Sequence, residues 1–153
     1  MTIYRWRFLI AVVFAVLILI VPGCSKNTSP VPTQDVLQQY FEQNILNRNF
    51  VVDLATDSSR DITSQFAGDT FRLLKNTYFD GPMTSTHAGG AITGTWNCNE
   101  DYSKLTINLV SPSVPAEFRF INREWKFTSK SFPVMKLSPW GTIDPKVLHM
   151  RRI

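Results

Sequence analysis

The sequence predicts a mostly β domain, an antiparallel sandwich or barrel of about eight strands with one N-terminal α-helix. Short runs of alternating apolar and polar residues fill the chain after residue 50, and turn-forming residues separate them. The connections are mostly short, which favours antiparallel pairing, and one apolar stripe with helical spacing precedes all the strands.

The helix is expected at residues 33–49, where Thr33 can cap the first turn and Pro32 lies just outside it. Its apolar face would consist of Val36, Leu37, Tyr40, Phe41 and Ile45. A helix with one apolar face packs across a sheet or over the mouth of a barrel. No lysine flanks this stripe, which disfavours a helix lying on a membrane surface.

The clearest strand pair spans residues 91–110, where two alternating runs flank the polar turn 97–103. The apolar residues that share one face of each run are Ile92, Trp96, Cys98, Leu105, Ile107 and Leu109. This pattern predicts a β-hairpin with one buried face.

The other strands are expected from the same alternation. They lie near residues 50–54, 71–73, 83–86, 118–120, 125–127, 132–137 and 147–152. Residues 62–69 would link two of them, and residues 111–115 and 138–145 would form longer loops. The last strand could pair with the first, which would leave the sheet without exposed edges.

A barrel of eight strands has an interior that side chains can fill or that can hold one small ligand. The expected inward residues are Val52, Leu54, Phe71, Leu73, Met83, Ile92, Trp96, Leu105, Ile107, Leu109, Phe118, Phe120, Trp125, Phe127, Met135, Leu137, Leu148 and Met150. Most are bulky, which favours a filled core. The alternative is a ligand pocket beside Gly94, lined by Trp96 and Trp125. Trp140, in a loop, would either pack on the rim or serve as an exposed anchor for a partner or ligand.

The first 23 residues have the pattern of a secretory signal. Arg5 and Arg7 precede an uninterrupted apolar run over residues 8–21. As a helix this run would rise about 21 Å, short of a hydrocarbon core of about 30 Å. The alternative is a short anchor that is not cleaved.

Residues 21–24, Val-Pro-Gly-Cys, resemble the lipobox of bacterial lipoproteins. In that family the cysteine is acylated and becomes the first residue after cleavage. The resemblance implies lipidation at Cys24, a tether over residues 24–32, and attachment to a membrane through the N-terminal lipid. Ser25, which is uncharged, resembles the pattern of lipoproteins sent to the outer membrane of the bacterial cell envelope.

A second resemblance covers the chain from Phe50 to the end. Its residues are Asp61-Ile62-Thr63-Ser64-Gln65-Phe66, Gly68, Phe71, Asp80-Gly81, Gly94-Thr95-Trp96, Ser103-Lys104-Leu105-Thr106-Ile107 and Trp125. In this pattern the chain is similar to the small lipocalin-like domains of bacterial lipoproteins. The resemblance implies an up-and-down barrel within a domain of residues 33–153, and it allows a small apolar ligand.

The charge is nearly balanced in the mature form. The net charge is +4, but Arg5 and Arg7 lie in the leader, so a chain that starts at Cys24 carries +2. This disfavours nucleic acid as a partner. Residues 34–118 hold five basic and ten acidic residues, whereas residues 119–153 hold eight basic and two acidic residues. Either these charges cancel across a closed sheet, or a basic edge docks on anionic headgroups.

The sequence predicts no enzyme, cofactor or metal site. His87 and His149 lie in unrelated segments without metal-ligand spacing. Acylation of Cys24 would leave Cys98 unpaired, and Cys98 is expected in the core because it shares a face with Trp96 and unpaired cysteines are commonly buried. No phosphate-binding loop, nucleophile elbow or zinc pattern occurs. An enzyme would gain support if either histidine lay beside a carboxylate in a cleft.

Two functions therefore remain from the sequence. The first is a membrane-anchored envelope lipoprotein whose barrel binds a small apolar ligand. The alternative is a filled barrel that contacts an envelope protein or polysaccharide through its loops, with no partner protein identified. A continuous interior cavity above about 300 Å³ would favour the first function.

Overall fold

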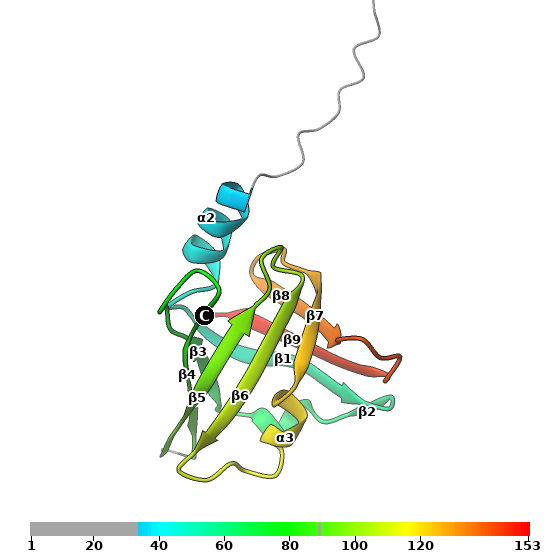
Figure 1. Ribbon diagram of the computed structural model, residues 1–153. Helices are drawn as coiled ribbons and strands as arrows, with labels where there is room; N and C mark the ends of the chain where they lie inside the picture. Colours follow the sequence, from blue (N-terminus) through cyan, green and yellow to red (C-terminus); the bar gives the residue numbers. More distant parts are fainter. Residues whose placement is uncertain (1–33, 89) are drawn as a thin grey trace, which may run out of the picture. The chain divides into compact units, whose positions relative to one another are not determined.

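The structure is a computed structural model that describes residues 34–88 and 90–153. The leader (residues 1–23), Cys24 with the tether (24–32) and Thr33 lie outside the described residues. The described chain forms one antiparallel sheet of nine strands that closes on itself (Figure 1). Eight strands make the barrel wall and one short strand extends it, which confirms the mostly β fold and the predicted closure.

The elements follow each other around the barrel in chain order. They are α2 (Gln34–Asn44), β1 (Asn49–Asp57), β2 (Arg60–Asp61), the 3-10 helix η1 (Thr63–Phe66), β3 (Thr70–Leu73), β4 (Asp80–His87), β5 (Gly90–Cys98), β6 (Lys104–Ser111), α3 (Phe118–Ile121), β7 (Glu124–Ser129), β8 (Val134–Pro139) and β9 (Lys146–Arg152). From β3 on, each strand pairs with the next, and β1 closes the barrel by pairing with both β3 and β9.

The closing pair runs antiparallel from Phe50 opposite Arg152 to Asp57 opposite Lys146. Its register shifts between Val52 and Leu54, because a β-bulge there adds one residue to β1. The added residue reverses which side chains point inward. Leu54, expected inward, is therefore not part of the core, and Ala55 is buried instead.

Large side chains fill the barrel interior. Apart from Val52, Leu54 and Phe127, the whole expected inward set is buried, and Val52 and Phe127 pack against it. The hairpin of β5 and β6 forms as expected, and the six apolar residues predicted on its inner face are all buried. The filled core predicted from the bulky residues is what the described chain shows.

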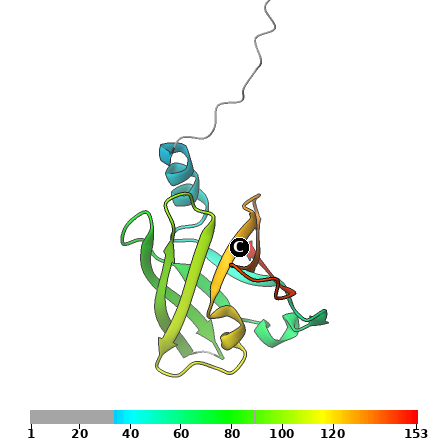
Figure 2. The ribbon, with the colours of Figure 1, turned by 45° about the vertical axis from the view of Figure 1, so that its right-hand side comes forward.

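Helix α2 stands at one end of the barrel (Figures 1 and 2), where its second half packs on the core. Phe41 is 1% exposed, and its ring centroid lies 4.7 Å from that of Tyr102 and 5.9 Å from that of Trp96. The hydroxyl of Tyr40 donates to the carbonyl of Lys130. Val36 was expected on the apolar face but is 53% exposed, because it lies in the first turns, away from the barrel.

The helix is shorter than expected, since it ends at Asn44 instead of residue 49. Asn47 has a φ of 58°, a left-handed conformation that stops the helix and that asparagine adopts more readily than most residues. Strand β1 then begins at Asn49.

The opposite end is covered by η1 and α3. Residues 118–120 were expected to form a strand, and that prediction was wrong. Phe118–Ile121 form a single helical turn, and the Phe118 amide donates to the Pro115 carbonyl at 3.0 Å. An apolar–polar–apolar pattern over only three residues fits a helical turn as well as a strand, so it could not distinguish the two structures. The rings of Phe118 and Phe120 pack against Phe66 of η1 at 6.3 and 6.1 Å.

Gly94 marks a close approach of two strands. A Cβ atom there would lie 1.9 Å from the carbonyl oxygen of Asn108 and 2.6 Å from the Cα of Leu109. The register between β5 and β6 shifts at the same place, between Thr93 and Gly94. The space beside Gly94 is therefore occupied by the backbone of β6.

We predict that Gly94→Ala destabilises the protein by at least about 2 kcal/mol, because the methyl group would meet backbone that has no room to move. Gly90→Ala in the same strand is the matched control, since its nearest neighbour is the His87 carbonyl oxygen at 3.5 Å. Urea unfolding of the two variants measures the difference. Equal stability would contradict the close approach.

Candidate functional site

The residues expected to line an interior ligand pocket are spread through the core. Trp96 is 1% exposed and packs against Phe41 of α2, whereas Trp125 is 0% exposed and packs against Phe120 of α3. Each indole N–H already has a partner: Trp96 donates to the Leu74 carbonyl at 2.7 Å and Trp125 to the Ile121 carbonyl at 2.9 Å. The two rings therefore support opposite helices and have no free polar group.

Trp140 lies partly buried on the rim, just after β8. Its backbone N–H donates to the Glu124 carbonyl at 3.0 Å, and the Lys104 ammonium lies 5.7 Å from its ring centroid. The next residues form the loop that ends at β9, where Ile143 is fully exposed. This partial burial favours packing on the rim over the exposed anchor that the sequence left as the alternative.

A polar hollow of about 480 Å³ opens to solvent at the α3 end of the barrel. Its walls come from the β1–β2 hairpin, from η1 and from the segment around α3. The lining residues are Asp57, Ser58, Arg60, Ile62, Gln65, Ala116, Glu117, Arg119, Phe120 and Arg123. Because three segments that are distant in sequence contribute, we call this surface the α3 hollow and treat it as the candidate site.

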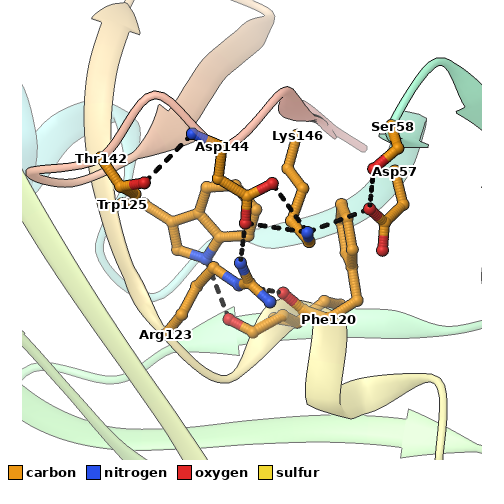
Figure 3. A network of polar contacts seen from close by, with 9 residues as sticks. Asp57, Ser58, Phe120, Arg123, Trp125, Thr142, Asp144 and Lys146 are labelled. Carbon is orange, nitrogen blue, oxygen red and sulfur yellow. Dashed lines mark hydrogen bonds and ion pairs between the residues drawn. The ribbon is translucent and has the colours of Figure 1, made fainter.

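Arg123 is held in place at one wall of the α3 hollow (Figure 3). Its Nε donates to the Phe120 carbonyl at 2.8 Å, and its guanidinium lies 5.6 Å from the Phe120 ring and 5.5 Å from the Trp125 ring. Nη1 lies 3.4 Å from Oδ2 of Asp144. The side chain is thus fixed by a carbonyl, a carboxylate and two aromatic faces.

Asp144 continues into a chain of alternating charges. The Lys146 ammonium contacts both Asp144 and Asp57 (Figure 3). It lies 2.8 Å from Asp144 Oδ1 and 3.0 Å from Asp57 Oδ1. The hydrogen bond from Lys146 lowers the pKa of Asp57, and the bonds to Asp144 and then Asp57 raise the pKa of Lys146. The carboxylate of Asp57, which lines the hollow, is therefore paired with an ammonium.

A second cluster joins the residue before β3, the last residue of β4 and the residue before α3. His87 Nδ1 lies 2.9 Å from Asp69 Oδ1, and His87 Nε2 lies 3.4 Å from Glu117 Oε1. Asp69 is 2% exposed; burial raises its pKa, and the hydrogen bond from His87 opposes that rise. Oδ2 of Asp69 and the hydroxyl of Ser85 are buried without a partner among the described residues.

A histidine beside a carboxylate in a cleft was the condition under which an enzyme would gain support, and this cluster meets only part of it. His87 lies between two carboxylates, but of the three groups only Glu117 lines the α3 hollow. His149 lies in β9 opposite Lys136, and burial, followed by the charge of Lys136, lowers its pKa. Within the described chain, no group of three or more His, Cys, Asp or Glu residues is arranged to hold a metal ion.

The early acidic and late basic segments meet where the barrel closes. Arg151 Nε lies 3.0 Å from Asp53 Oδ1, and Lys146 pairs with Asp57 across the same two strands. These pairs favour cancellation across the sheet over a basic docking edge. Lys126 and Lys136 are exposed on β7 and β8 and make no ion pair with a described residue.

Comparisons of the chain with protein-family models, with curated proteins and with solved structures gave no match. Across residues 34–88 and 90–153, no helix is long and apolar enough to span a membrane.

The sequence did not predict the α3 hollow. Its walls depend on α3, which was expected to be a strand, and on η1, which was expected to be a link. The available signals were the excess of basic residues after residue 118 and the exposed turn containing Arg60. Neither signal indicates that Arg60 and Arg119 face the same hollow, because that depends on how the hairpin and α3 pack.

We predict that Cys98 is inert in the native protein, because burial raises the pKa of its thiol to about 12. In a Cys24→Ser chain, Cys98 is the remaining thiol. At pH 8 an aromatic disulfide reagent should label it only after unfolding.

The same shift gives a pH dependence with a definite sign. An unfolded thiol loses its proton near pH 8.5, so Cys98 should lower the free energy of unfolding as the pH rises from about 9 toward about 12. Cys98→Ala is the reference that lacks this effect. Rapid native labelling at pH 8, or identical pH profiles for the two proteins, would contradict the buried neutral thiol.

Proposed function

We propose that the protein is a lipid-anchored lipoprotein of the bacterial envelope whose filled barrel works as an interaction module. The observation that carries this proposal is the packed interior. Aromatic and aliphatic side chains occupy the barrel, and helices with buried phenylalanines cover both ends. A barrel filled in this way must contact its partners through its outer surface.

The sequence supports the anchor. The lipobox-like ending at Cys24 and the signal-like leader fit acylation and export, and residues 24–32 would separate the barrel from the bilayer. A single acyl chain binds membranes only marginally, so durable anchoring requires the two or more chains that the lipoprotein pathway supplies. The resemblance of the strands to lipocalin-like domains of bacterial lipoproteins points in the same direction.

Contact through loops has more support than carriage of a small apolar ligand. The segment after β6 ends in Ala116 and Glu117, which line the α3 hollow. The loop between β8 and β9 lines a second open hollow with Gly141, Thr142 and Ile143. The loops expected to carry contacts were residues 111–115 and 138–145. The second lines a hollow itself, whereas Ala116 and Glu117, which line the α3 hollow, directly follow the first.

We predict that radioactive palmitate labels the wild-type chain expressed in a bacterium that has the lipoprotein pathway, and that Cys24→Ser abolishes the label. Cys98→Ser should keep it, because that thiol is buried in the core. Labelling that survives Cys24→Ser would remove the lipoprotein assignment.

We also predict that native mass spectrometry of the Cys24→Ser protein, purified from its own host, gives the mass of the bare chain. A filled interior leaves no place for an apolar passenger that survives purification. A reproducible additional mass that organic solvent extracts would favour the small-ligand function and contradict the filled barrel.

A further inference from the structure

We propose that the α3 hollow binds the carboxylate or phosphate groups of an acidic polysaccharide. This inference rests on the proposed interaction function and specifies its partner. The hollow has about 480 Å³, within the range of about 300–1,000 Å³ that is typical of small-molecule sites. One charged sugar unit, rather than a whole chain, would occupy it.

The hollow contains cationic groups that are available to an anion. Arg60, Arg119 and Arg123 all line it, and they come from β2, from α3 and from the residues just after α3. Arg60 and Arg119 are exposed and make no ion pair with any described residue. Guanidinium groups bind carboxylate and phosphate with paired hydrogen bonds, which makes arginine suited to this ligand chemistry.

The two carboxylates in the lining form no ion pair with Arg60 or Arg119. Asp57 lies 3.0 Å from the Lys146 ammonium, and Glu117 lies 3.4 Å from Nε2 of His87. Neither Lys146 nor His87 is part of the lining. Each lining carboxylate therefore faces a partner outside the hollow, and Arg60 and Arg119 are left with unmatched charge.

Arg123 provides a fixed third position. Its partner Asp144 and the Phe120 carbonyl occupy some of its donors, while a guanidinium has five N–H groups in all. Because the two aromatic faces and the carbonyl already hold this side chain, little conformational entropy is lost when a ligand contacts it.

The rest of the lining fits a sugar better than a lipid. Ser58 and Gln65 are exposed and can hydrogen-bond to hydroxyl groups. The apolar lining residues Ile62 and Phe120 are only 8% and 7% exposed, so the walls offer little apolar surface for an acyl chain. A polar ligand with one oxyanion matches both features.

The test is calorimetric titration at low salt of the full chain, held in a polyoxyethylene detergent. The probes are glucuronate, glucose 6-phosphate, inorganic phosphate, glycerol phosphate and, as a neutral control, glucose. We expect saturable binding of the two acidic sugars, with dissociation constants on the order of 1 mM or tighter. Both should bind more tightly than free phosphate or glycerol phosphate, and glucose should not bind.

Two double variants each remove two positive charges, one inside the α3 hollow and one elsewhere on the barrel. Comparing them distinguishes binding in the hollow from general electrostatic attraction. Arg60→Gln with Arg119→Gln should weaken binding of the acidic sugars by about tenfold or more. Arg72→Gln with Lys136→Gln changes exposed residues of β3 and β8 that lie outside both hollows, and it should leave binding within about twofold. Circular dichroism melts confirm that all four substitutions leave the fold intact.

Each other outcome overturns the inference. Equal weakening by both double variants would show general charge attraction, and tighter binding of glycerol phosphate would indicate a lipid headgroup. Absence of saturable binding would remove the site. If the native mass is that of the bare chain while no acidic sugar binds, the filled interaction module stands and only its acidic-polysaccharide partner is wrong.

Discussion

The complete occupation of the barrel interior by side chains is the constraint on which the rest of the structure depends. Closure through β1 and β9 removes the sheet edges, and it also fixes how many inward side chains must fit together. At Gly94 the fit is so close that the backbone of β6 occupies the volume of a side chain. Phe41 on one helix and Phe118 on the other complete the packing at the two ends. The burial of these side chains is what supports the proposal that recognition takes place on the outer surface and not inside the barrel.

The alternation of residues predicted the wall of the barrel well, because an inward-facing side chain at every second position is a property of the strand itself. It failed where the chain departs from a regular strand. The bulge in β1 turns Ala55 toward the core at the place where Leu54 was expected. The segment Phe118–Ile121 buries its apolar residues as a helical turn and not as a strand. Neither departure has a local signal, since both are decided by the packing of distant segments. The α3 hollow was missed for the same reason, because Arg60 and Arg119 are close only in the folded chain.

The distribution of charge has a similar explanation. The acidic first part and basic last part of the chain become neighbours because the last strand returns to the first, which places Arg151 beside Asp53 and Lys146 beside Asp57. Pairs at the surface contribute little to stability each. Their structural effect is to give Asp53 and Asp57 basic partners on the last strand, so that neither carboxylate forms an ion pair with Arg60 or Arg119 of the α3 hollow. The same closure that fills the barrel therefore leaves a cationic surface at one end.

The indole N–H signals of Trp96 and Trp125 in a ¹⁵N nuclear magnetic resonance spectrum test the filled interior most directly. Both groups are buried and hydrogen-bonded to backbone carbonyls, at 2.7 and 2.9 Å, from opposite ends of the core. On titration of the Cys24→Ser protein with 1-hexanol, an uncharged apolar probe that the α3 hollow is not expected to bind, the filled barrel predicts that neither signal shifts. Trp140, on the rim, reports any contact with the surface. A saturable shift of both buried signals at one probe per chain would show that the barrel is hollow and would contradict the account.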